Sequence, residues 1–135
     1  MPRRIVVYAL LALFAWATPA IAAIATLEEA TAERVLGKPD APVTIVEYAS
    51  LGCSHCADFH RDTLPQIKAA YIDTGRVRLV FAAFPLGGPA VAASMVARCA
   101  PQNAYFGLLD MFFREQARWA GAREPLKEIA RIGRF

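Results

Sequence analysis

The stretch VTIVEYASLGCSHCADFH, residues 43–60, decides the fold of this chain. Residues 42–49 form an apolar, β-branched run that is typical of a buried strand. Residues 57–72 have helical spacing. The helix face that this spacing predicts contains Cys56, Phe59, Thr63, Ile67, Ala70 and Tyr71. The cysteine pair of C-S-H-C, residues 53–56, therefore lies at a strand-to-helix junction, with its first sulfur at the N-terminus of the helix.

This position predicts a reactive first cysteine. The first N–H groups of a helix have no intrahelical partner, and together with the helix dipole they stabilise negative charge. The thiolate is the nucleophilic form of cysteine. Cys53 is therefore predicted to be a nucleophile, and the C-x-x-C pair to be a redox site.

His55 lies between the two cysteines. Its imidazole can offer a hydrogen bond or a positive charge to the Cys53 thiolate, and either effect lowers the pKa of Cys53. A stabilised reduced form makes the disulfide a stronger oxidant, so we expect a site that donates its disulfide. The alternative is that His55 is a solvated turn residue.

Glu47 interrupts the apolar strand six residues before Cys53. A carboxylate in a buried strand costs free energy unless it is paired or has a function. We expect Glu47 to lie beneath the thiol pair and to exchange protons with Cys56 as that sulfur attacks or leaves. The alternative is a solvated glutamate at the edge of the sheet.

A metal site is a weaker interpretation of the same residues. Cys53, Cys56 and His60 could supply three ligands and His55 a fourth. Structural zinc usually uses two ligand pairs separated by a longer loop, and the sequence has no second pair. Covalent haem attachment needs histidine where Ala57 stands. We expect neither metal nor cofactor, and we expect His60 to pack or to face water.

Residues 1–25 have the pattern of an export signal. Arg3 and Arg4 precede an apolar run over residues 5–17, and Pro19 precedes a small-residue stretch. Cleavage after Ala22 is expected, which makes residues 1–22 a signal peptide and the product periplasmic or secreted. An uncleaved signal anchor is the alternative. An oxidising compartment lets disulfides persist.

Charge and cysteine count add two constraints. Two of the 15 basic residues lie in the export signal and all 12 acidic residues lie after it, leaving 13 basic and 12 acidic side chains. This balance gives no support to nucleic-acid binding. There are three cysteines, so pairing Cys53 with Cys56 leaves Cys99 over.

The rest of the chain predicts one small domain. Pro65 should kink the first helix near Thr63, and Gly75 should end it. Residues 77–84 read as a second buried strand, parallel to the first in a βαβ unit. Helices are then expected over residues 89–100, 104–118 (capped by Asn103) and 124–132, with their methionine and aromatic side chains in the core.

These motifs together resemble the DsbA family of exported thiol–disulfide oxidoreductases, within the thioredoxin superfamily. The resemblance covers residues 35–132 and is carried by LGKPDAP at 36–42, VEYAS at 46–50, CSHC at 53–56, FH at 59–60, YIDTG at 71–75 and FPL at 84–86. It implies an α/β fold: a thioredoxin-like βαβ core with a helical insertion at residues 89–135. It also implies that Cys53 attacks, Cys56 resolves, His55 tunes the thiolate and Glu47 is the buried acid. Substrates would be cysteine-containing exported polypeptides, and a quinone-linked membrane partner would reoxidise the site.

The chain departs from the family pattern at two places. Ser54 stands where the family commonly has proline, and the sequence ends at Phe135, inside the helical insertion. We therefore expect residues 23–135 to form an incomplete domain that lacks the C-terminal β-hairpin, last helix and cis-proline loop. The first strand would then have one edge without a partner. The predicted function is disulfide donation to exported proteins. The alternatives are a non-catalytic remnant of such an enzyme, or a reductase or isomerase of the same fold.

Overall fold

The computed structural model describes residues 25–134, so the predicted signal peptide lies outside the described residues. The elements are α2 (Leu27–Thr31), β1 (Val35–Leu36), β2 (Val43–Ala49), α3 (Ser54–Asp58), η1 (Phe59–Thr63), α4 (Leu64–Ile67), η2 (Lys68–Ile72), β3 (Val77–Ala83), α5 (Gly88–Arg98), α6 (Gln102–Arg114), α7 (Gln116–Trp119) and α8 (Pro125–Ile132).

The sheet confirms the predicted βαβ unit. Its strand order is β1-β3-β2, and β2 runs parallel to β3 with Glu47 opposite Phe81. The short strand β1 was not predicted; it pairs antiparallel with β3, with Val35 opposite Val80. Two residues are too few to show the alternation that identifies a strand in sequence. Among the described residues, β2 has a strand partner on one edge only, as expected.

The helix after the cysteines is one run from α3 to η2, in which two segments are π-helical. The first of these, η1, ends at Thr63, and Pro65 lies in the first turn of α4, where its missing N–H is tolerated. The helix therefore changes from π-helical to α-helical at the point where a kink was expected, and the kink itself stays a prediction. Gly75 adopts φ +76°, as the predicted helix end requires.

The predicted buried face of this helix is wrong in part. Three of its six residues, Cys56, Phe59 and Ile67, are half-buried against the core, and the other three are exposed. The buried residues are Ala57, His60, Leu64 and Ile72, a stripe next to the predicted one. Apolar residues occur on both stripes, so spacing alone could not separate them. The contact between η1 and α6 turns the observed stripe inward.

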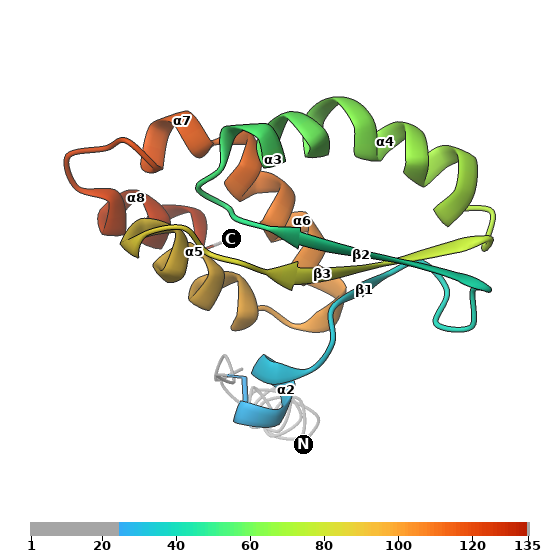
Figure 1. Ribbon diagram of the computed structural model, residues 1–135. Helices are drawn as coiled ribbons and strands as arrows, with labels where there is room; N and C mark the ends of the chain where they lie inside the picture. Colours follow the sequence, from blue (N-terminus) through green and yellow to red (C-terminus); the bar gives the residue numbers. More distant parts are fainter. Residues whose placement is uncertain (1–24, 135) are drawn as a thin grey trace, which may run out of the picture.

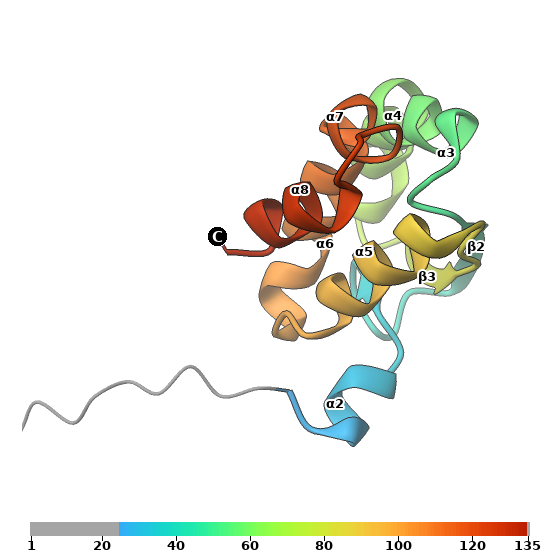
Figure 2. The same cartoon turned by 90° about the vertical axis from the view of Figure 1, so that its left-hand side faces the viewer.

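Helices α3, α4 and α6 lie on one side of the sheet, and α5 lies at the end of the sheet where β2 and β3 finish (Figures 1 and 2). Alternate residues of β2 therefore meet different surroundings. Glu47 and Ala49 face the helices. Val46 and Tyr48 face away, and their exposed fractions are 47% and 75%. The buried side of β2 is thus the side on which the cysteine-bearing helix begins.

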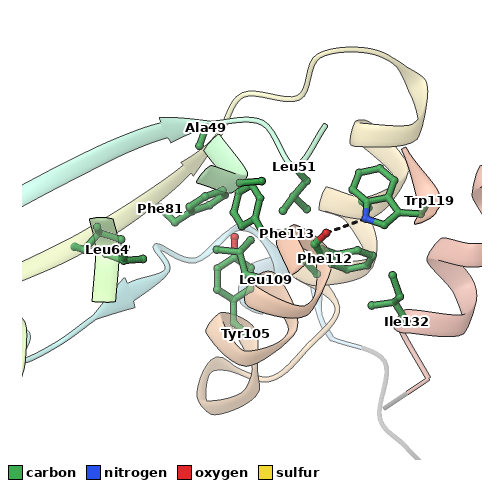
Figure 3. Packing of buried hydrophobic residues seen from close by; sticks show 14 of the residues in the cluster. Ala49, Leu51, Leu64, Phe81, Tyr105, Leu109, Phe112, Phe113, Trp119 and Ile132 are labelled. Atoms are coloured by element: carbon green, nitrogen blue, oxygen red, sulfur yellow. Dashed lines mark hydrogen bonds between the residues drawn. The ribbon is translucent and has the colours of Figure 1, made fainter. Parts of the chain in front are cut away.

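One continuous hydrophobic core joins the βαβ unit to the later helices. Figure 3 shows Ala49, Leu51 and Phe81 in the same cluster as Phe113 and Trp119. The Trp119 indole N–H donates to the Phe112 carbonyl at 2.8 Å, so this buried polar atom is satisfied. The helices after residue 88 are therefore part of the core of this domain.

The later helices confirm most of the sequence prediction and correct several details. The helix expected over residues 104–118 is divided at Glu115 into α6 and α7. The aromatic side chains of α6 and α7 are buried as expected, except that Phe106 is only partly buried. Met95 is 65% exposed because α5 packs through its buried alanines. Helix α6 begins at Gln102 after Pro101, so Asn103 is not its cap. Within residues 25–134, none of the helices has the length and apolarity needed to cross a membrane.

Candidate active site

The loop between β2 and α3 brings Cys53 to the start of the helix. Cys53 is the N-cap of α3, with extended backbone angles of φ −90° and ψ 123°. Ser50, which is buried, holds the loop: its Oγ accepts from the Gly52 N–H at 3.1 Å and from the Leu86 N–H at 3.0 Å. The predicted position of Cys53 at a helix N-terminus is confirmed.

Gln116 fastens the same loop from the far end of the chain. Its Nε2 donates to the Leu51 carbonyl at 2.7 Å and to the Cys53 carbonyl at 2.9 Å. Sequence reasoning missed this residue, because a lone glutamine 63 positions away carries no motif. Ser50 could have been found from the sequence, because it lies in the V-E-Y-A-S stretch of residues 46–50.

The surroundings of Cys53 favour the thiolate. The backbone N–H of Cys56 is the largest influence, followed by the Cys56 thiol; both donate to the Cys53 sulfur and lower the pKa of Cys53. The backbone N–H of His55 acts in the same direction. Burial and the charge of Asp58 oppose these effects without reversing them.

Cys56 has the opposite environment. Burial is the largest influence and raises the pKa of the Cys56 thiol. The negative charges of Cys53 and Glu47 add to this increase. The two sulfurs are therefore unequal: Cys53 is suited to carry negative charge, and Cys56 to carry a proton.

The imidazole of His55 is exposed and makes no hydrogen bond within residues 25–134. The part of His55 that lowers the pKa of Cys53 in this structure is its backbone N–H. A tuning role for the imidazole stays a prediction.

Glu47 lies on the inner side of β2, and its partner is His60. The Nε2 atom of His60 is 2.9 Å from Oε1 and 3.1 Å from Oε2 of Glu47. The side chains of His60 and Glu47 are only 4% and 12% exposed. Glu47 is therefore not a solvated edge residue, and of the two expectations for His60, packing is the one observed. The pairing was not predicted, although F-H at residues 59–60 belonged to the motif set.

The remaining candidates are Cys99 and the metal site. All three cysteines are free thiols, and Cys99 is exposed at the end of α5. In the part of the chain that the structure describes, no three His, Cys, Asp or Glu side chains are grouped closely enough to hold a metal ion.

Comparison with known proteins agrees with this geometry. The model of the thioredoxin family matches residues 29–132. The chain belongs to the thioredoxin family. Its similarities place it in the DsbA group of that family, as the resemblance in sequence had implied.

Two solved structures and one curated protein show the extent of the similarity. The crystal structure of alpha-DsbA1 from Wolbachia pipientis is 38% identical with a TM-score of 0.69, over 76% of this chain and 52% of that one. Oxidised BdbD from Bacillus subtilis is 26% identical with a TM-score of 0.65, over 73% of this chain and 57% of that one.

The curated protein, from Rickettsia bellii, is provisionally named a protein-disulfide oxidoreductase. It is 33% identical over 105 residues, which are 75% of this chain and 40% of that protein. The chain thus spans 40% to 57% of the length of each of these three proteins.

Proposed function

We propose that this DsbA-type chain is a thiol–disulfide oxidoreductase that donates a disulfide to exported proteins through Cys53 and Cys56. The observation that carries the proposal is the inequality of the two sulfurs. Backbone N–H groups and the Cys56 thiol lower the pKa of Cys53, while burial raises the pKa of Cys56. A stabilised thiolate in the reduced form favours giving the disulfide away.

The proposed reaction moves two electrons from a substrate dithiol to the Cys53–Cys56 disulfide. A substrate thiolate attacks the sulfur of Cys53, a mixed disulfide forms, and Cys56 leaves with the electron pair of the broken bond. A second substrate thiolate then attacks the substrate sulfur of the mixed disulfide and expels the Cys53 thiolate. The substrate leaves with a disulfide, and the chain is left as the dithiol that the structure shows.

Glu47 is proposed as the acid–base group for Cys56. The Cys56 thiolate, once released, must gain a proton to reach its stable form, and its charge is disfavoured by burial and by Glu47. A carboxyl group on the same side of the sheet is suited to this transfer.

The proposed substrates are cysteine-containing polypeptides outside the cytoplasm, and the proposed location is the periplasm or the secreted fraction. The relatives support this proposal, because one of them, from Bacillus subtilis, is named disulfide bond formation protein D. A quinone-linked membrane partner that reoxidises Cys53 and Cys56 completes the proposed cycle.

The direct test is oxidation of a dithiol peptide by the oxidised chain, compared with the Cys53→Ser variant. We expect stoichiometric peptide oxidation by the wild type and none by the variant. Equal rates in the two proteins would contradict the proposal. Equilibration of the wild type with glutathione buffers measures the reduction potential of the Cys53–Cys56 pair. This separates a disulfide donor from a reductase, because the disulfide of a reductase persists at potentials where that of a donor is already reduced.

A further inference from the structure

His60 has a position that the proposed reaction does not yet use. His60 is buried, with a relative exposure of 6%. Its ring stacks on that of Phe113, and the two ring centroids are 4.1 Å apart. The Phe81 ring meets it edge-on at 6.0 Å. Packing on both sides fixes the plane of the imidazole, so Nε2 is held against the Glu47 carboxylate.

His60 also lines two cavities. One has a volume of about 300 Å³ and has Lys68 and Asp110 in its wall; the other, of about 100 Å³, has Arg61 and Asp110 in its wall. The side chains of Lys68, Asp110 and Arg61 are 44% to 60% exposed, so the cavities reach solvent.

The second ring nitrogen of His60, Nδ1, takes no part in the pairing with Glu47. Nδ1 has no hydrogen-bond partner among residues 25–134. Nδ1 is not completely sealed from solvent, because among residues 25–134 the fully buried side-chain atom without a hydrogen-bond partner is Arg34 Nε. His60 therefore contacts buried Glu47 through Nε2, and the same residue lines two cavities that reach solvent.

The charged groups around His60 already have partners of their own. Arg61 pairs with Asp58 and Asp62 at 2.8 Å each, and Lys68 pairs with Asp73 at 2.6 Å. On α6, Asp110 pairs with Arg114, and burial raises the pKa of Tyr105. Glu47 contacts the imidazole directly, and Lys68, Arg61, Asp110 and Arg114 line the same cavities as His60.

We propose that His60 is a proton-transfer and positioning residue that links solvent to Glu47 and, through Glu47, to Cys56. The proposal rests on the proposed oxidoreductase function. When a substrate thiolate breaks the Cys53–Cys56 bond, Cys56 leaves as a thiolate. The His60–Glu47 pair gives it a proton, and water in the cavities returns a proton to the Nδ1 side of the ring. During reoxidation the proton moves in the opposite direction before Cys56 attacks.

The first test compares the oxidised wild type with His60→Gln, which keeps a side-chain donor for Glu47 but cannot carry a proton near neutral pH. Reduction by dithiothreitol is followed by acid quenching and mass spectrometry across mildly acidic to neutral pH. We expect the variant to react at least about tenfold more slowly near neutral pH, with a changed pH profile. The control variant is Lys68→Gln, which alters the same cavity wall without touching Glu47 and should react like the wild type.

A second measurement separates proton transfer from a loss of structure. Iodoacetamide alkylation of Cys53 in the reduced protein should be the same in His60→Gln and in the wild type, because the proposed effect acts at Cys56. His60→Ala leaves space beside both cavities, and added imidazole should restore part of its rate. A folded His60→Ala that gains nothing from imidazole would contradict the proposal.

The outcomes also separate this inference from the function on which it rests. If the wild-type disulfide neither reacts with dithiothreitol nor oxidises a dithiol peptide, the oxidoreductase function fails and the inference fails with it. If the wild type reacts and His60→Gln keeps the same rate and pH profile, the inference alone is overturned.

Discussion

The strand–helix junction of residues 43–60 and the helical region of residues 88–132 contribute to the site in different ways. The junction supplies the reacting sulfurs and the backbone N–H groups that stabilise Cys53, all within a few residues of one another. The helical region supplies no sulfur to the pair, but Gln116 holds the Cys53 carbonyl and Phe113 holds the ring of His60. The comparison teaches that the reactive groups are set locally, whereas their position depends on packing from far along the chain.

The largest expected effect lies within the junction. Cys56→Ser removes the thiol that closes the Cys53–Cys56 disulfide, so the variant cannot cycle. A mixed disulfide formed at Cys53 by a disulfide-bearing peptide should persist, because no resolving thiol is present. Intact-mass spectrometry after mixing with such a peptide should show the adduct in Cys56→Ser and its rapid loss in the wild type. Equal adduct lifetimes would mean that Cys56 does not resolve.

The next effect tests the core that joins the two regions. Trp119→Ala should lower the free energy of unfolding by about 3–5 kcal/mol, since it empties a fully buried site. The matched control is Tyr48→Ala on the open face of β2, which should change it by less than about 0.5 kcal/mol.

Circular dichroism on heating measures both variants against the wild type, which should melt in one cooperative transition. A wild-type chain without a cooperative transition would favour the interpretation as a non-catalytic remnant.

A smaller effect is expected where the helical region touches the loop. Gln116→Ala leaves the Leu51 and Cys53 carbonyls without their donor, which should cost about 1–3 kcal/mol. It should also slow alkylation of Cys53, because the loop that presents the sulfur is less firmly held. Arg118→Ala, two residues further along α7 in an exposed ion pair, should cost at most about 1 kcal/mol and leave alkylation unchanged. Similar effects of the two variants would contradict the role of Gln116 in holding the Cys53 loop.

The smallest effect is a pH dependence of stability in the reduced protein. The pKa of Cys53 is lowered from its ordinary value of 9.0, so between the folded pKa and about 9 the unfolded state binds more protons. The stability due to Cys53 is therefore fully present above about 9 and is lost as pH falls through the folded pKa. The pKa of Cys56 is raised, so the stability due to Cys56 is present below about 9 and is lost as pH rises through the folded pKa.

The melting temperature of the reduced wild type, minus that of reduced Cys53→Ser, should accordingly increase as pH rises toward about 9. The oxidised wild type has no thiol to titrate and should show no such trend. A constant difference between the reduced proteins at every pH would contradict the lowered pKa.

Much of the fold was predictable because its signals are local. The β-branched run of residues 43–49 and the C-x-x-C that follows it identified the parallel βαβ unit, and Pro65 and Gly75 located a change of helix type and a helix end. The two-residue strand β1 and the buried stripe of the first helix were not predictable, since both depend on contacts with distant elements.

The site divides in the same way. Cys53, Cys56 and Glu47 could be named as candidates because the strand–helix pattern fixes where they lie. His60 was expected only to pack or face water, and Gln116 was not considered, because their roles arise from pairs 13 and 63 residues apart. His55 was expected to act through its imidazole, and in the structure its backbone N–H is the part that lowers the pKa of Cys53.

The most direct test of the account is the pH dependence of iodoacetamide labelling at Cys53 in the reduced chain. Peptide mapping separates this sulfur from those of Cys56 and Cys99, and free glutathione in the same tube gives the reference rate. The account predicts that Cys53 is labelled faster than glutathione at mildly acidic pH, where an ordinary thiol is protonated. Labelling of Cys53 that follows the glutathione curve throughout would contradict the stabilised thiolate on which the proposed function depends.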